Sequence, residues 1–146
     1  MNEEISVRIT GKAGHGIMAA GLMLAHTYKN SGLHVFAIQD YMSRIRGGNN
    51  FFQVRAAAGP VYAPREKNEI IIALDKEAAE ANKAALAPGG LLILDDKKSG
   101  IKELEKGWFN APIYALAEEA GGPKYANSVA LGIIAALTCE NIEDAG

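Results

Sequence analysis

The sequence is poor in cysteine, with Cys139 as the one thiol in 146 residues. A single cysteine can form neither an intrachain disulfide nor a cysteine-based metal or iron–sulfur site, so any cluster would have to be held by a partner. Histidine is scarce too: the three histidines show no metal-ligand spacing and no serine or aspartate partners for a catalytic triad. The sequence therefore predicts no metal site and no catalytic residue.

Long apolar runs and an excess of basic charge are also missing. No segment approaches the roughly 18 apolar residues that a membrane-spanning helix requires. The N-terminal stretch MNEEISVRIT carries acids where a secretory signal has a basic flank, so we expect a cytoplasmic location and no membrane contact. The formal net charge of −2 gives no indication of nucleic-acid binding.

What the sequence does contain is an alternation of strand and helix patterns over a length that suits one domain, residues 1–146. Helices are expected from 17 to the NSG at 30–32, over 76–87 and over 127–137, with no further element in the closing TCENIEDAG. Strands are expected over 5–10, 33–40, 50–57, 68–75 and 91–96, with 111–117 as a short strand running into a helix. This order predicts an α/β fold: an open, mostly parallel Rossmann-like sheet with helices on both faces, in which a βαβ crossover joins the first two strands.

The segment GKAGHG, residues 11–16, lies between the first expected strand and the first helix. A turn of small residues followed by the free amides of a helix can bind a pyrophosphate or a similar anion, and Lys12 adds a positive charge. As a dinucleotide fingerprint the loop is incomplete, because Ala13 stands where the second glycine would let phosphates approach the backbone. Two alternatives remain: a turn that needs small residues only for packing, and a solvated His15.

Two polar features follow the second expected strand. Asp40 stands near the position of the ribose-binding acid of a Rossmann unit, which would make the chain an NAD-binding domain of a dehydrogenase. In the loop SRIRGGNN, residues 43–50, Arg44 and Arg46 would share one face of an extended segment. They could bind a phosphate or a carboxylate, or pair with the chain's own acids. We interpret Asp95 and Asp96, next to two lysines, as a solvated turn.

The order of these motifs resembles the gamma subunit, or gamma domain, of the 2-oxoacid:acceptor (ferredoxin) oxidoreductases. That family carries a strand, a G-x-G-G-Q-G loop and a helix, and then an R-G-G loop leading into a strand that contains VR. Here these motifs become GKAGHG (11–16) and RGGNNFFQVR (46–55), followed by IIIALD, APGGLLILDD and N-x-V-A-L-G at 127–132. The segment SRIRGGNN is most similar to the version fused to the N-terminus of the alpha subunit, so we expect a piece of a longer subunit. The chain departs from the family loop at Ala13 and His15.

The resemblance implies a fold like domain III of pyruvate-ferredoxin oxidoreductase and a role in an enzyme complex. Such a complex decarboxylates a 2-oxoacid, such as pyruvate or 2-oxoglutarate, on thiamine diphosphate and Mg. It passes electrons through iron–sulfur clusters to ferredoxin and transfers the acyl group to coenzyme A. The cofactors would be held by the alpha and beta subunits or domains, and this chain alone is expected to be inactive.

The resemblance also implies two sets of site residues. The coenzyme A phosphates would bind at the glycine-rich loop, comprising Gly11, Lys12, Ala13, Gly14, His15 and Gly16. The interface with the other domains, or the acyl-acceptor side, would include Ser43, Arg44, Arg46, Gly47, Gly48 and Asn49. Surfaces that are buried in the complex, namely helix 127–137 and Met18, Leu22 and Met23 of the first helix, could make the isolated chain a homodimer. The remaining alternative is a scaffold domain whose loop binds no ligand.

Overall fold

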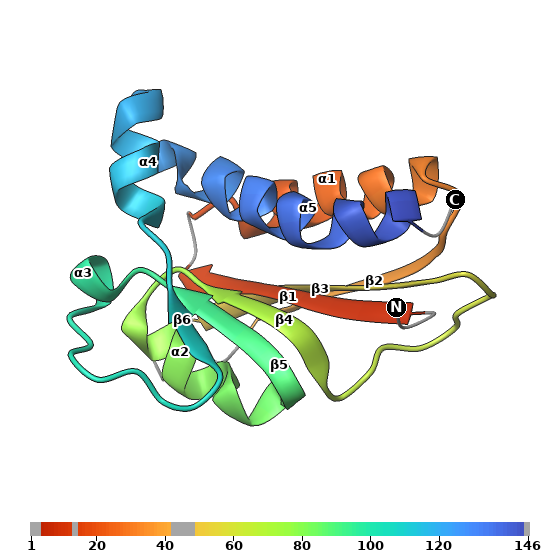
Figure 1. Cartoon of the computed structure of the whole chain (residues 1–146), viewed down its shortest axis with the longest axis horizontal. Helices are drawn as coiled ribbons and strands as arrows, with labels where there is room; N and C mark the ends of the chain where they lie inside the picture. Colours follow the sequence, from red (N-terminus) through yellow and green to blue (C-terminus); the bar gives the residue numbers. More distant parts are fainter. Residues whose placement is uncertain (1–3, 13–14, 42–48, 145–146) are drawn as a thin grey trace.

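The computed structural model describes residues 4–12, 15–41 and 49–144. Within these residues six strands form one sheet in the order β2-β3-β1-β4-β5-β6 (Figure 1). The strands are β1 Glu4–Lys12, β2 His34–Tyr41, β3 Asn49–Ala57, β4 Asn68–Ala73, β5 Leu86–Leu94 and β6 Trp108–Asn110. The helices are α1 Ile17–Asn30, α2 Lys76–Asn82, α3 Asp96–Ser99, α4 Ile113–Ala120 and α5 Ala126–Asp144, with 3₁₀ turns at 83–85 and 123–125.

The sheet is mixed and mostly parallel, as the sequence predicts. Strand β1 pairs in parallel with β4, β4 with β5, and β5 with β6, whereas β3 is antiparallel to both of its neighbours, β1 and β2. Because β1 and β2 both run opposite to β3, they run in the same direction, and α1 connects them as a crossover. The sequence did not predict that β3 would be inserted between the two strands of this crossover.

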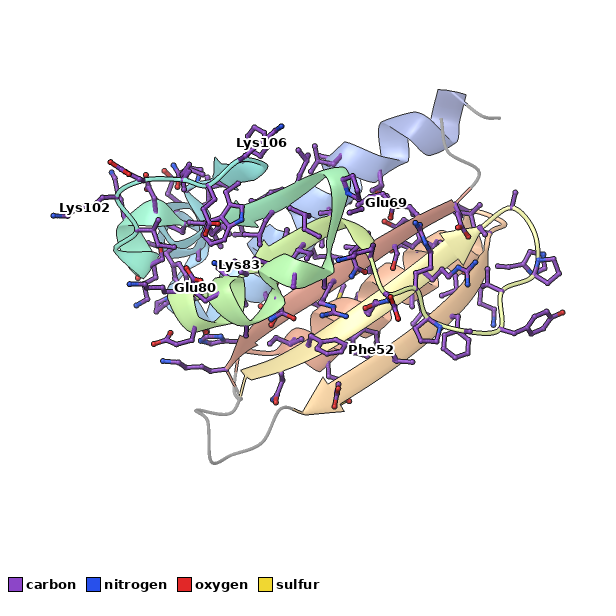
Figure 2. All side chains as sticks on the ribbon, turned by 90° about the horizontal axis from the view of Figure 1, so that it is seen from below. Phe52, Glu69, Glu80, Lys83, Lys102 and Lys106 are labelled. Carbon is purple, nitrogen blue, oxygen red and sulfur yellow. The ribbon has the colours of Figure 1, made fainter. Side chains whose placement is uncertain are left out.

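Helices cover both faces of the sheet, which confirms the predicted layers. Helices α1 and α5 lie side by side on one face, and α2 lies on the other (Figure 1). Strand β4 faces both layers: Ile70 and Ile72 belong to the core under α1 and α5, while Ile71 packs with Ala78 and Ala79 of α2. This double burial explains why the strand is apolar without alternation. On the α2 side, no helix of the described residues covers most of β2 and β3 (Figure 2).

Strand β5, expected over 91–96, spans Leu86–Leu94, and three further elements differ from the sequence predictions. The helix expected over 76–87 ends at Asn82 and continues as a 3₁₀ turn, because residues 87–90 already belong to β5. Of the short strand running into a helix expected over 111–117, the helix is confirmed as α4, but the strand is wrong. The sixth strand is 108–110, where Trp108 is buried beside Leu92. Ile113 and Ala117, four residues apart, are both fully buried, and this spacing is helical.

The C-terminal segment is the third difference, because α5 extends to Asp144 instead of ending near residue 137. A buried polar contact lies at the start of this extension: Tyr28 Oη of α1 donates to Thr138 Oγ1 at 3.1 Å, and Thr138 Oγ1 donates to Ile134 O at 2.8 Å. The buried hydroxyl of Thr138 is hydrogen-bonded, so this polar residue can lie on the buried face of α5, beyond the apolar stretch from which the helix was predicted.

The first half of α1 exposes large apolar side chains, as expected from the sequence. Met18, Leu22 and Met23 are 49%, 45% and 58% exposed, respectively. In α5 the corresponding expectation is only partly met, because Ala130 and Ile134 are fully buried while Leu137 is 38% exposed. Among the described helices, none has the length and apolar character needed to cross a lipid bilayer.

The packing of α1 on β3 can be tested with one glycine. A Cβ at Gly21 would lie 2.1 Å from Cδ1 of Phe52, so Gly21→Ala should lower the free energy of unfolding by about 1–3 kcal/mol through overpacking. Gly132 lies in α5 with no atom near its Cβ position, so Gly132→Ala should raise stability by about 0.5–1 kcal/mol. Urea unfolding of the two variants measures this contrast. A Gly21→Ala variant as stable as the parent would show that α1 does not approach β3 this closely.

Candidate functional site

The carboxyl ends of the parallel strands meet at one edge of the sheet. From this edge α1 leaves strand β1 on one face, while α2 leaves the neighbouring strand β4 on the other face. In open α/β sheets the divergence of connections from adjacent strands opens a crevice, and ligands bind there. The glycine-rich loop that follows β1 lies at this point.

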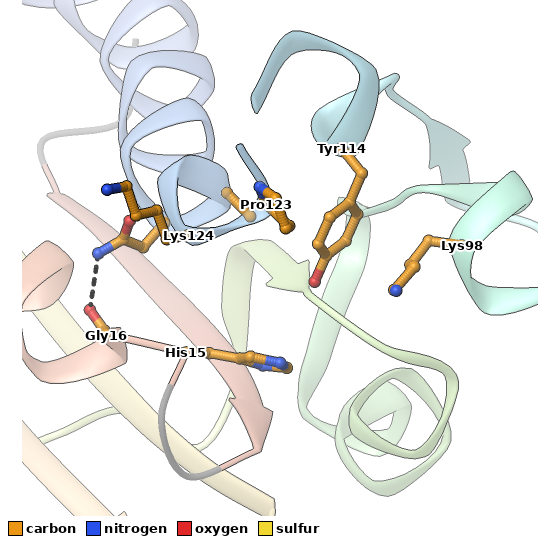
Figure 3. Close-up of a pocket in the computed structure, with 8 residues that line it drawn as sticks. His15, Gly16, Lys98, Tyr114, Pro123 and Lys124 are labelled. Atoms are coloured by element: carbon orange, nitrogen blue, oxygen red, sulfur yellow. Dashed lines mark hydrogen bonds between the residues drawn. The ribbon is translucent and has the colours of Figure 1, made fainter. Parts of the chain in front are cut away.

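A cavity of about 340 Å³ lies at this edge (Figure 3). Its lining comes from the end of the glycine-rich loop, from α3, from α4, from the 3₁₀ turn at 123–125 and from the start of α5. The lining residues are His15, Gly16, Lys98, Tyr114, Pro123, Lys124, Ala126 and Asn127. Sequence reasoning proposed only the first two as ligand contacts. The other six follow them by more than 80 positions in the chain, and only the fold brings them to the loop.

The cavity has a positively charged rim. Lys98 and Lys124 line it, and Lys12 ends the strand that leads into the loop. In the described part of the chain, no carboxylate lies within ion-pair distance of these three ammonium groups. Lys98 Nζ instead stands over the ring of Tyr114, 5.1 Å from its centroid. The rim can therefore attract an anion without first breaking a salt bridge.

The wall formed by α3 and α4 is held by a buried carboxylate. Asp95 is 7% exposed; its Oδ1 accepts from the amides of Lys97 and Lys98, and its Oδ2 accepts from the amide of Tyr114 at 2.9 Å. Tyr114 Oη in turn donates to Leu74 O at 3.1 Å, and burial raises the pKa of this phenol, with smaller contributions from Asp75 and Asp95. Our interpretation of Asp95 as part of a solvated turn is wrong, because backbone amides on two helices take up both of its oxygens.

The first turns of α1 and α5 are joined at Gly16. This glycine has φ +70°, and its carbonyl accepts a hydrogen bond from Asn127 Nδ2 at 3.3 Å, drawn as a dashed line in Figure 3. Asn127 is the first residue of the N-x-V-A-L-G motif, so the contact links two of the motifs that resemble the oxidoreductase family. It brings the amide ends of two helices to the same cavity, which favours negative charge there.

His15 closes the turn that leads from β1 to α1. Its Nδ1 accepts from the amide of Lys12 at 3.1 Å, and its own amide donates to Lys12 O at 3.2 Å. The ring packs over Gly11, where a Cβ would lie 2.6 Å from Nδ1. Nδ1 is also 4.0 Å from Oδ2 of Asp75. The side chain is 30% exposed, so His15 is partly solvated and partly held by the turn.

The charge of His15 is shaped by its surroundings. Burial is the main influence and lowers the pKa of the imidazole below its ordinary value. Asp75 opposes this effect, whereas Lys12 and Lys98 lower the pKa further. Because Nδ1 is an acceptor in this structure, the neutral ring carries its proton on Nε2.

The remaining predicted residues divide into two groups. Ala13, Gly14, Ser43, Arg44, Arg46, Gly47 and Gly48 lie outside the described residues, and Asn49 is described only as the first position of β3. Asp40, the proposed ribose ligand, is exposed on the edge strand β2. In a Rossmann unit the second strand is adjacent to the first, but here β3 separates β2 from β1. Asp40 is therefore not in the position from which it could bind the ribose of a dinucleotide at the glycine-rich loop.

Among the described residues, no group of three or more histidine, cysteine, aspartate or glutamate side chains could hold a metal ion.

Comparison with known proteins identifies the family. Residues 6–145 match the model of the pyruvate ferredoxin/flavodoxin oxidoreductase family. The chain belongs to this family. It is 25% identical over 142 residues to the ketoisovalerate oxidoreductase subunit VorA of Methanothermobacter thermautotrophicus, covering 97% of this chain and 30% of that protein. It is 29% identical over 140 residues to the 2-oxoglutarate synthase subunit KorC of Methanocaldococcus jannaschii, covering 90% of this chain and 74% of that protein.

Solved structures of family members have the same fold. The 2-oxoglutarate:ferredoxin oxidoreductase of Magnetococcus marinus, with 2-oxoglutarate, coenzyme A and succinyl-CoA bound, matches with TM-score 0.80 and 27% identity over 92% of this chain and 24% of that chain. The gamma subunit of a keto/oxoacid ferredoxin oxidoreductase from Geobacter sulfurreducens matches with TM-score 0.78 and 28% identity over 92% of this chain and 77% of that chain. The resemblance to gamma subunits is thus confirmed, and the chain spans about 30% of the length of the VorA subunits it matches. Nothing in these matches supports the NAD-binding alternative.

The junction of α1 and α5 can be tested at Gly16. Gly16 and Gly100 have φ of +70° and +73°, so alanine at either position should cost about 1–2 kcal/mol of stability through backbone strain. Only at Gly16 would the new Cβ meet a side chain, 2.5 Å from Asn127 Nδ2. We therefore expect Gly16→Ala to cost about 1 kcal/mol more than Gly100→Ala, because the contact to Asn127 is lost as well. Chemical unfolding measures the difference, and Asn127→Ala as a background should remove it. An equal cost in both backgrounds would mean that the two helix ends are not coupled.

Proposed function

We propose that this chain is the gamma component of a 2-oxoacid:ferredoxin oxidoreductase, an enzyme that converts a 2-oxoacid to an acyl-CoA. In this proposal the chain contributes to assembly and forms part of the site for the coenzyme A phosphates. Thiamine diphosphate, Mg and the iron–sulfur clusters belong to alpha and beta partners, and ferredoxin accepts the electrons of the complex. The chain works in the cytoplasm as one domain of a longer subunit, and it is inactive without its partners.

The observation that carries the coenzyme A proposal is the unpaired positive charge around the cavity. Coenzyme A offers a diphosphate and a further phosphate on its ribose, and phosphates are bound by ammonium groups and by the amides at helix starts. Lys98 and Lys124 provide the ammonium groups, and the first turns of α1 and α5 meet at Gly16. The relative from Magnetococcus marinus, whose structure contains coenzyme A, shares this fold over 92% of the chain.

The proposed site is wider than the loop suggested by the sequence. On one side of it stand His15 and Gly16, at the end of the glycine-rich loop. The opposite side is built by α3, α4 and the start of α5, whose positions depend on Asp95 and Asn127. A ligand bound between the two sides would hold α3 and α4 against α1 and should therefore stabilise the whole domain.

Coenzyme A binding is tested with one lysine on the cavity and one away from it. Coenzyme A should raise the melting temperature of the chain, and Lys98→Ala should weaken its binding about tenfold, because a charged contact to phosphate is lost. Lys102→Ala changes the net charge equally at an exposed position that does not line the cavity, and it should leave the Kd nearly unchanged. Isothermal titration calorimetry measures the Kd values. Equal effects of the two variants would show that binding responds only to overall charge.

The partner contacts are proposed for the loop residues Ser43, Arg44, Arg46, Gly47, Gly48 and Asn49. Changing Arg44 and Arg46 together to alanine should leave the melting temperature nearly unchanged while preventing co-purification with alpha and beta subunits. Arginine is favoured at protein interfaces, where its planar guanidinium pairs with carboxylates. Affinity purification of the tagged protein from its native cells, followed by mass spectrometry, gives the result. Recovery of a thiamine-dependent subunit with the parent and the variant alike would exclude the arginines from the interface.

A further inference from the structure

One carboxylate oxygen beside the glycine-rich loop has no hydrogen-bond partner. Asp75 follows β4, and its Oδ1 caps α2 by accepting from Ala78 N at 2.7 Å. Its Oδ2 is buried and has no donor among the described residues. Buried carboxylate oxygens almost always accept a hydrogen bond, so the missing donor calls for an explanation. His15 Nδ1 lies 4.0 Å away, but in the neutral ring this nitrogen is itself an acceptor, bonded to Lys12 N.

Two acceptors, His15 Nδ1 and Asp75 Oδ2, thus face each other behind the cavity. One proton on Nδ1 would turn this nitrogen into a donor and give Oδ2 a hydrogen-bond partner. If Nδ1 is protonated it can no longer accept from the Lys12 amide, and it can donate to Asp75 Oδ2 once the two atoms approach to about 2.8 Å. The Lys12 N–H then loses its partner inside the turn and becomes available to a phosphate oxygen. The imidazolium adds one positive charge to a cavity that His15 already lines.

We propose that Asp75 is a positioning residue that enables His15 to take up a proton from solvent when an anion binds in the cavity. The inference rests on the proposed function, because it concerns the same phosphate site. Asp75 does not line the cavity and therefore acts through His15. Binding of the anion, protonation of Nδ1 and release of the Lys12 amide favour one another. The affinity for phosphates should consequently increase as the pH falls towards 6.

The charged groups around His15 act in opposite directions. Burial disfavours the imidazolium most, Asp75 favours it, and Lys12 on β1 and Lys98 on α3 disfavour it further. Glu77, in the first turn of α2, interacts with Asp75 but is an acceptor too when ionised, so it does not supply the missing donor. Tyr114 on α4 is neutral near pH 7, as an ordinary phenol is, and burial raises its pKa further. Lys124 contributes a further positive charge at the rim. A bound polyanion offsets the charges of the two lysines and thus removes their part of the opposition to protonation, while burial continues to oppose it.

The test uses the full chain and nuclear magnetic resonance of its histidine rings. Pyrophosphate should raise the pKa of His15 by about one unit relative to sodium chloride of equal ionic strength, which corresponds to about tenfold tighter binding by the protonated form. His26 and His34 are exposed and do not line the cavity, so their titrations in the same spectra are internal controls. Asp75→Asn keeps a residue that caps helices well but removes the charge, and it should abolish most of the rise.

A second measurement separates this inference from the proposed function. His15→Gln keeps a side-chain acceptor for the Lys12 amide but cannot take up the proton. Calorimetry of coenzyme A binding at pH 6 and pH 8 should show a smaller gain in affinity at low pH for His15→Gln than for the parent. A rise in the His15 pKa with pyrophosphate, without coenzyme A binding, would overturn the coenzyme A site and leave the proton uptake standing. Coenzyme A binding with an unchanged His15 pKa, or no response to either ligand, would overturn the inference.

Discussion

The position of every group at the site depends on the burial of β1 between β3 and β4. The strand alternates: Val7 and Ile9 face α1 and α5, while Ser6, Arg8 and Thr10 face the α2 side. Each of these polar residues has a specific partner, since buried polar groups are costly without one. Ser6 Oγ donates to Asn68 Oδ1 on β4, and Arg8 donates to Gln53 on β3 and to Asn82 on α2. The apolar face sets the depth of the strand and the polar face its register, and together they fix where the glycine-rich loop begins.

The positive cavity of a chain with net charge −2 has a structural origin. Two acids near this edge of the sheet, Asp75 and Asp95, are largely buried and are engaged by backbone amides. Asp75 caps α2 through one oxygen, and Asp95 accepts from amides of α3 and α4 through both. Their charges are thus shared with helix starts, which carry partial positive charge, and are not available to the lysines. The ammonium groups at the rim consequently remain free although acids lie close to them in the sequence.

The local features of the fold could be predicted from the sequence, but the long-range ones could not. The strand–loop–helix unit at residues 4–30, the buried strand β4 and the exposed apolar side of α1 follow from periodicity and from small residues. The insertion of β3 between β1 and β2 does not, because the choice of strand neighbours depends on side-chain packing between distant segments. For the same reason Lys98, Tyr114 and Asn127 could not be predicted as site residues. They line one cavity only because the fold brings α3, α4 and α5 to the glycine-rich loop. The position of Asp95 directly after a buried strand could have indicated its capping role, but the adjacent lysines favoured the interpretation as a solvated turn.

The histidine in the loop distinguishes two ways of binding a phosphate. A loop that uses only backbone amides has the same charge at every pH, and a glutamine at the position of His15, as in the family pattern, would preserve this property. A histidine accepts the same hydrogen bond from Lys12 when neutral, so the fold of the turn does not require glutamine. It differs in having a second state, in which Asp75 supplies the acceptor and the turn gives up one amide. A histidine in place of glutamine can therefore link anion binding to protonation without altering the sheet. The acceptor for the protonated ring, Asp75, is already held in place as the cap of α2.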